Sequence, residues 1–210
     1  MGDIRIEHVV TSGTFSLDGG TWEVENNVWL IGDDDDVVII DPAHDPATIA
    51  EAIGQREVTA ILLTHGHDDH IRAVDEFRQL VDAPVFLPPA DRMLWNEVFP
   101  ETSPDGYVND GDVFEIAGES LHAIHTPGHS PGSTCYYLPE ERTLFSGDTL
   151  FNGGPGATGR SYSDFPTIIE SIRGHLLTLP PEVVVLTGHG EATSIGAEAS
   201  QLDEWIARGH

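Results

Sequence analysis

Short apolar runs alternate with polar turns along the chain, and their periods predict strands interleaved with helices. Runs of β-branched and aliphatic residues predict strands, whereas apolar residues three or four positions apart predict helices. Strands are expected at residues 4–10, 21–31, 37–40, 58–63, 84–87, 113–116, 121–125, 134–138, 143–145 and 182–186. Helices are expected at residues 45–54, 71–80, 89–99, 163–179 and 195–208.

Two polar segments refine this pattern. Asp45 followed by Pro46 is typical of a helix N-cap and first turn. The run of four aspartates at 33–36 lacks the ligand spacing of a calcium loop and predicts a solvated turn. Strands dominate both halves, without a linker or repeat between them. We therefore expect a single α/β domain over residues 1–210, in which helices cover both faces of two packed sheets.

The amino-acid composition indicates which partners the protein can bind and in which cellular compartment it is expected. The chain carries 36 acidic residues against nine basic ones, all arginine, for a formal charge of −27. Such a protein is expected to be repelled by nucleic acid and by anionic membrane surfaces. No apolar run has the length of a membrane span, and residues 1–7 lack the features of a signal peptide. The single cysteine, Cys135, is expected in the core, so the sequence predicts a cytoplasmic protein without an intrachain disulfide.

The segment from Thr64 to His70 concentrates the candidate chemistry. It holds three histidines and two aspartates directly after the apolar run 58–63. His65 and His67 are two positions apart, so in extended backbone their imidazoles point to the same side. An alternative is a helix cap beside structural histidines, but three such imidazoles without partners would each carry a desolvation cost. Imidazole and carboxylate ligands suit Zn, Fe or Mn.

The pattern His65-x-His67-x-Asp69-His70 resembles the signature of the metallo-β-lactamase-fold hydrolases. Over most of the chain the resemblance is closest to the glyoxalase II-like, or hydroxyacylglutathione hydrolase-like, branch. It implies a four-layer αββα sandwich with the site at one edge between the sheets. The family's further ligands have matches in three later motifs, namely His129 in 126–132, Asp148 in 144–151 and His189 in 186–190.

The resemblance also implies a role for each ligand. The first divalent ion would be held by His65, His67 and His129, and the second by Asp69, His70 and His189. Asp148 would bridge the two ions, for which zinc is expected, with iron or manganese as alternatives. Asp69 would handle protons near a bridging water. Asp41 and Thr64 are assigned to orienting these ligands, although a turn role for Asp41 is equally open.

The implied reaction is hydrolysis of a small acyl thioester by a metal-bridging hydroxide. A bridging hydroxide needs no protein nucleophile, which agrees with the absence of a Ser-His or Cys-His signature. Arg160 and Tyr162 match the glyoxalase II residues that contact glutathione; otherwise they belong to a flexible glycine-rich loop. The family's C-terminal helical domain has no counterpart after His189, which leaves the thiol carrier open.

Three other functions remain open at this point. They are a persulfide dioxygenase with one iron, a β-lactam hydrolase, and a metal-binding protein without enzymatic activity. The expected partner is a small molecule rather than nucleic acid or membrane, and the sequence predicts no oligomeric state.

Overall fold

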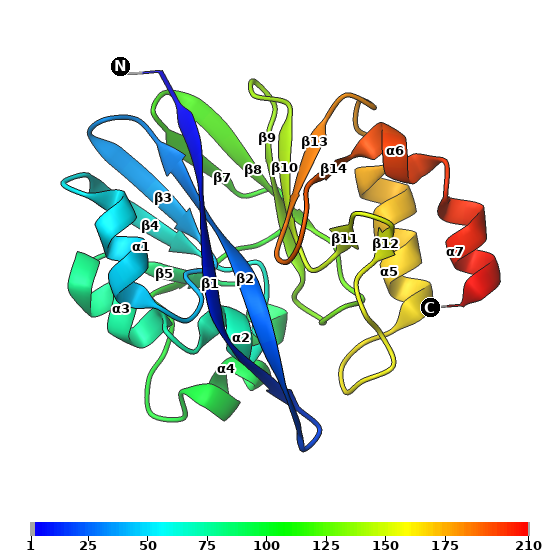
Figure 1. Cartoon of the computed structure of the whole chain (residues 1–210), viewed down its shortest axis with the longest axis horizontal. Coiled ribbons are helices and arrows are strands. Elements are labelled where there is room, and N and C mark those ends of the chain that lie inside the picture. Colours follow the sequence, from blue (N-terminus) through cyan, green and yellow to red (C-terminus); the bar gives the residue numbers. More distant parts are fainter. Residues whose placement is uncertain (1–2, 210) are drawn as a thin grey trace.

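The computed structural model describes residues 3–209, which form two β-sheets packed between two layers of helices (Figure 1). This αββα arrangement confirms the predicted fold class. The first sheet has the strand order β1-β2-β3-β4-β5-β6 and the second β14-β13-β10-β9-β8-β7. The first comprises β1 (Arg5–Leu17), β2 (Gly20–Gly32), β3 (Asp36–Ile40), β4 (Glu57–Leu62), β5 (Val85–Leu87) and β6 (Gly106–Tyr107). The second comprises β7 (Val113–Ile116), β8 (Glu119–His125), β9 (Thr134–Leu138), β10 (Thr143–Gly147), β13 (Val184–Thr187) and β14 (Thr193–Ser194).

The helices divide between the two outer layers, and a small hairpin lies near the second sheet (Figure 1). Beside the first sheet are α1 (Pro46–Ile53), α2 (Asp68–Ile71), α3 (Val74–Val81), the 3₁₀ turn η1 (Pro89–Asp91) and α4 (Arg92–Val98). Beside the second are α5 (Phe165–Ser171), the π-helical segment η2 (Ile172–Leu176), α6 (Ile195–Ala199) and α7 (Leu202–Arg208). The hairpin pairs β11 (Leu150–Phe151) with β12 (Gly154–Pro155).

Three apolar clusters hold the four layers together. The sequence of β3 is continuously apolar because both faces of this strand are buried. Val37 and Ile39 face the helices, whereas Val38 and Ile40 face the second sheet. The middle cluster joins the sheets, with Phe145 of the second sheet fully buried against the first. The outer clusters bury helix residues such as Phe77 of α3 and, on the other side, Trp205 of α7.

Two polar predictions are confirmed. Asp45 caps α1 by accepting a hydrogen bond from Thr48 N at 3.1 Å, and the helix ends at Gly54, whose φ of 70° is one that glycine readily adopts. The aspartate run forms a turn in which residues 34–36 are exposed, as predicted, whereas Asp33 is buried and its Oδ1 accepts from the backbone N–H groups of Asp35 and Asp36.

The predicted strand 4–10 was too short. Strand β1 continues to Leu17 and pairs along its whole length with β2, forming a long hairpin closed at Asp18 and Gly19. Both turn residues have positive φ, 52° and 77°, the backbone that matches the twist of a two-residue hairpin. The two-residue strands β6, β11, β12 and β14 were not predicted either.

Three predicted helices differ from the observed ones. The helix expected at 71–80 is two helices, because α2 begins inside the histidine motif and Ala73, with ψ of −7°, separates it from α3. The helix expected at 195–208 is interrupted between Ala199 and Leu202. The helix expected to reach 179 changes to π-helical geometry after Ser171 and ends at Leu176.

Cys135 lies in the core on β9, as expected, and burial raises the pKa of its thiol to about 11. A thiol with this pKa stays protonated near neutral pH and is a poor nucleophile. Within residues 3–209, no helix combines the length and the apolar character needed to cross a bilayer.

Candidate metal centre

The predicted ligand segments all follow the carboxyl ends of strands. The motif 64–70 follows β4 of the first sheet. His129, Asp148 and His189 follow β8, β10 and β13 of the second sheet. Carboxyl ends of strands are where layered α/β folds collect ligand-binding groups. The fold therefore brings both sheets to one site.

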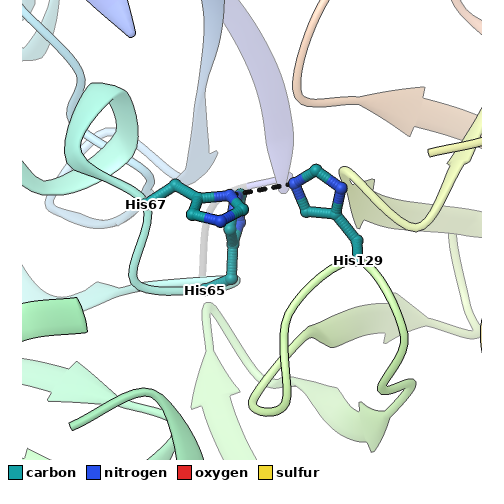
Figure 2. Close-up of side chains that lie close together, drawn as sticks. All are labelled: His65, His67 and His129. Carbon is teal, nitrogen blue, oxygen red and sulfur yellow. Dashed lines mark hydrogen bonds between the residues drawn. The ribbon is translucent and has the colours of Figure 1, made fainter. Parts of the chain in front are cut away.

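His65, His67 and His129 form a first ligand group. Their candidate ligand atoms all lie within 4.8 Å of one another, and all three side chains are buried. Figure 2 shows the imidazoles converging, with His67 Nδ1 and His129 Nε2 only 3.0 Å apart. Three imidazole nitrogens at this spacing can surround one cation.

Hydrogen bonds on the outer side of the rings orient this group. His65 Nδ1 lies 3.0 Å from Thr64 Oγ1, and His129 Nδ1 lies 2.9 Å from the carbonyl oxygen of Ala157. The inward nitrogen of His65 and of His129 is therefore Nε2, whereas His67 turns Nδ1 toward His129. His65 Nε2 is buried and has no hydrogen-bond partner among residues 3–209. An orphaned buried acceptor facing two other imidazoles fits a metal ion.

Asp69, His70 and His189 form a second group, also within 4.8 Å. His70 Nε2 and His189 Nε2 are 3.3 Å apart, and Asp69 Oδ2 lies 3.3 Å from His189 Nε2. The outer nitrogens are again engaged, His70 Nδ1 by Asp41 Oδ2 at 2.9 Å and His189 Nδ1 by the carbonyl oxygen of Glu25 at 2.6 Å. The inward atoms suit a second cation.

Asp148 lies between the two groups. Its Oδ2 is 3.5 Å from His129 Nε2 of the first group and 3.4 Å from His189 Nε2 of the second. Its Oδ1 is 3.5 Å from His70 Nε2 and has no hydrogen-bond partner within the described chain. This position is the one that a carboxylate bridging two cations requires.

The electrostatics of the two groups differ. Burial, reinforced by the neighbouring imidazoles, lowers the pKa of His67 to about 3, so this ring is neutral and able to ligate. Burial would lower the pKa of His189 as well, but Asp148 and Asp69 raise it to about 10. Burial opposes the charge on Asp148, yet His189 and His70 hold its pKa well below the usual range. To ligate a cation in the second group, His189 would therefore have to lose its proton.

Asp41 orients the ligand loop in the structure. Its carboxylate accepts hydrogen bonds from Thr64 N at 2.8 Å and Thr64 Oγ1 at 2.6 Å, besides its contact with His70. Asp41 also forms a third possible metal group with His65 and His70. Because these donors already engage both carboxylate oxygens, we interpret Asp41 as a residue that holds Thr64 and His70 in place.

Two residues beside the ligands were missed by sequence reasoning. Asn26 of β2 is buried and donates from Nδ2 to Asp69 Oδ2 at 3.0 Å, and Asp91 contacts both loops of the first group. Asn26 lies in a predicted strand and Asp91 in a predicted helix. No local pattern distinguishes either residue from ordinary polar positions in such elements.

The site opens into a small cavity of about 310 Å³ between the ligands and the β1–β2 hairpin. The hairpin supplies Phe15 and Trp22, and Phe151 lies on the side of His189, with ring centroids 6.2 Å apart. Arg160 lines the same cavity, with its guanidinium 3.9 Å from the centre of the Trp22 ring. This cavity is hereafter called the site pocket.

Tyr162 lies elsewhere. It lines a separate hollow on the hairpin side together with Asp18 and Glu97, and its hydroxyl is 3.4 Å from Glu97 Oε1. The structure thus brings together the seven predicted ligands and Arg160. It does not bring Tyr162 into the site pocket.

The fold and the ligand set together are those of a metal-binding protein of layered α/β architecture, and comparison with known proteins identifies its family. Residues 21–189 match the model of the metallo-β-lactamase superfamily, and the chain belongs to this family. The family and the His/Asp cluster together indicate a dinuclear metal site.

Individual relatives match most of the chain. It is 35% identical over 192 residues to a probable metallo-hydrolase, YqgX, of Bacillus subtilis, covering 85% of this chain and 91% of the relative. It is 32% identical over 191 residues to the hydroxyacylglutathione hydrolase GloC of Haemophilus influenzae, covering 83% and 90%. Among solved structures, TTHA1623 in a di-iron-bound form matches with a TM-score of 0.73 and 31% identity, over 90% of this chain and 96% of the other.

Proposed function

We propose that the chain, acting as one domain over residues 1–210, is a dinuclear metal-dependent hydrolase of small acyl thioesters in the glyoxalase II-like branch. The position of Asp148 carries this proposal, because one carboxylate reaches both ligand groups at the floor of the site pocket. The likeness to GloC, a hydroxyacylglutathione hydrolase, supports the thioester assignment. Small-molecule specificity agrees with the modest volume of the pocket.

The seven side chains fit two divalent ions, for which we propose zinc, with iron or manganese as alternatives. When bound, such ions lower the pKa of a water molecule from about 15.7 toward about 7 and polarise a carbonyl group. His65, His67 and His129 would hold the first ion, and Asp69, His70 and His189 the second. Asp148 would link the two positions through its carboxylate.

The remaining steps belong to the chain's own residues. Asp69 lines the site pocket and is fixed by the amide of Asn26. Burial opposes its charge, but His70 and His189 lower its pKa to about 2, so the carboxylate presents a negative charge to the ions rather than holding a proton. A thiolate leaves without prior protonation, so a thioester requires no additional acid. Phe15, Trp22 and Phe151 form the apolar walls that would exclude water from the acyl group.

We assign Arg160 to the thiol carrier, because it is the basic residue that lines the site pocket. Its planar guanidinium suits a carboxylate on the carrier. Tyr162 is left out of this assignment because it lies in the separate hollow beside Glu97. A single buried cysteine, Cys135, agrees with a cytoplasmic location, which we propose as well.

The proposal is tested by assaying protein of defined metal content against three substrate classes. We expect thiol release from small acyl thioesters to exceed β-lactam opening, with no oxygen uptake in the presence of a persulfide. Oxygen uptake that depends on iron and persulfide would instead identify a dioxygenase. Faster turnover of β-lactams than of every thioester would identify a β-lactam hydrolase.

Replacing Arg160 by alanine is expected to raise the KM for a carboxylate-bearing thioester by roughly 10- to 100-fold, the scale of one charge-assisted contact. Because Arg160 lies outside the ligand groups, kcat and metal content should stay close to wild type. Steady-state kinetics and metal analysis measure both effects.

Two variants serve as controls for this substitution. Arg160→Lys keeps the charge and should lose less affinity than Arg160→Ala. Arg92→Ala removes a partly exposed arginine that bonds to Tyr107 and Ser103 away from the site pocket, and should leave KM unchanged. An unchanged KM in Arg160→Ala would mean that the carrier does not contact this residue.

A further inference from the structure

Asp91 is a fully buried carboxylate at the junction of η1 and α4. It accepts three short hydrogen bonds. Gly66 N donates to Oδ2 at 2.8 Å, Ser130 Oγ donates to Oδ2 at 2.6 Å, and Gly132 N donates to Oδ1 at 2.6 Å. An aspartate at the start of a helix commonly caps it, but the Asp91 side chain makes no capping bond to α4. The carboxylate is directed at the loops instead.

The three donors are chain neighbours of the first ligand group. Gly66 lies between His65 and His67, and Ser130 follows His129. The loop containing Gly66 leaves the first sheet, whereas the loop containing Ser130 and Gly132 connects β8 to β9 of the second sheet. Asp91 therefore joins, through one carboxylate, the two loops that must meet for three imidazoles to converge.

The close fit explains two glycines. A Cβ atom on Gly132 would lie 2.6 Å from Asp91 Cγ, and one on Gly66 would lie 3.0 Å from Asp91 Cβ. Real side chains do not tolerate the first distance, so the approach of the carboxylate to Gly132 requires glycine. Burial raises the pKa of Asp91, while its hydrogen bonds to Ser130, Gly66 and Gly132 favour the charged form.

The second ligand group is held by other contacts. Asn26 orients Asp69, Asp41 orients His70, and the Glu25 carbonyl oxygen orients His189. Asp41 serves both groups, because it also holds Thr64 beside His65, but none of these three contacts involves Asp91. A disturbance at Asp91 should consequently reach the first group without an equal effect on the second.

We propose that Asp91 is a positioning residue that sets the geometry of the first ion's imidazoles separately from those of the second ion. The inference rests on the two-ion centre of the proposed function but not on its thioester chemistry. It assigns the two metal positions to separate supporting contacts, Asp91 for one and Asn26 for the other.

The test is a titration of metal-free protein with Co²⁺, followed by visible absorption and by bound metal after dialysis. Wild type should bind about two ions. In Asp91→Asn one ion should bind as in wild type, and the other 10- to 100-fold more weakly, the usual effect of losing a partner that orients a ligand. The absorption of the weakened site should change, because its three nitrogen ligands no longer converge.

A reciprocal variant and a matched control sharpen the result. Asn26→Ala should weaken the other ion, so that the absorption band lost differs from the one lost in Asp91→Asn. Asp105→Asn alters a carboxylate that accepts a backbone hydrogen bond from Val85 N away from the ligand loops, and should leave both ions unchanged. If Asp91→Asn does not fold, as judged by circular dichroism, Ser130→Ala decides the question, because it removes one donor and should weaken the same ion to a smaller degree.

Each remaining outcome contradicts a specific claim. Equal weakening of both ions, or no weakening, in Asp91→Asn or its Ser130→Ala substitute would overturn the positioning role. Wild-type protein that binds fewer than two ions would refute the two-ion centre itself. Normal metal binding without thioester hydrolysis would leave the role of Asp91 intact and refute only the proposed substrate.

Discussion

Asp148→Asn is expected to lower thioester hydrolysis by at least about 100-fold, the upper end of the loss found when a residue that only orients a ligand is changed. The loss of activity in Asp148→Asn should exceed that value, because the Asp148 oxygens lie 3.4–3.5 Å from imidazoles of both ligand groups. Asparagine keeps the size but removes the negative charge that offsets two cations. Kinetics at saturating metal measure the loss, and metal analysis should show fewer than two ions.

Two further measurements separate this effect from unfolding. Circular dichroism should show a folded Asp148→Asn protein. Asp45→Asn makes the same chemical change at the cap of α1, where asparagine also caps well, and should retain full activity. Hydrolysis near the wild-type rate in Asp148→Asn would exclude a bridging role for this carboxylate.

Removing the metal with a chelator is expected to abolish hydrolysis and to lower the thermal midpoint. Each ligand group takes residues from both sheets, since His65 and His129, like His70 and His189, follow strands of different sheets. An ion present at about 1,000 times its Kd stabilises the folded chain by roughly 4 kcal/mol. For a chain of this size the loss corresponds to about 8–16 °C per ion.

Differential scanning calorimetry with and without chelator measures the shift, and added Zn²⁺ or Fe²⁺ should restore both stability and activity. His67→Ala should reproduce part of the shift, because it removes one ligand of the first group. A chelated protein with unchanged midpoint and full hydrolysis would exclude a metal mechanism.

The convergence of the seven candidate ligands could be predicted because their sequence signals are local. His65, His67, Asp69 and His70 occupy six consecutive positions, and each later ligand follows an apolar run that ends at a glycine-containing turn. The direction of the strands then brings the ligands together. Strands β8, β10 and β13 run the same way, and the residues that follow them meet those that follow β4.

Residues that act across the fold could not be predicted in this way. Asp91 lies 25 residues from Gly66 and 39 from Ser130, and Asn26 lies 43 from Asp69. Each resembles any other polar residue within its own element, and only the packing of the sheets gives it a partner.

The end of the β1–β2 hairpin was missed for a different reason. Residues 11–14 are small and polar and do not alternate with apolar ones, so the pattern predicts a strand that ends at residue 10. The Asp18-Gly19 dipeptide is a strong hairpin signal, and it was available in the sequence. A two-residue hairpin turn at Asp18-Gly19 predicts a strand that extends to Leu17, with Phe15 opposite Trp22, as the structure has it.

The hairpin has a consequence for how such an enzyme can diverge. It supplies Phe15 and Trp22 to the site pocket, and Asp18 at its tip accepts hydrogen bonds from Ser161 N and Ser161 Oγ in the loop that carries Arg160. Neither segment contributes any of the seven ligands. Mutations at the tip of the hairpin and at Arg160 itself leave Asn26, Glu25 and Ala157 in place, which orient three of the ligands. Selection for a new substrate can therefore act on these positions while the ligand geometry is preserved.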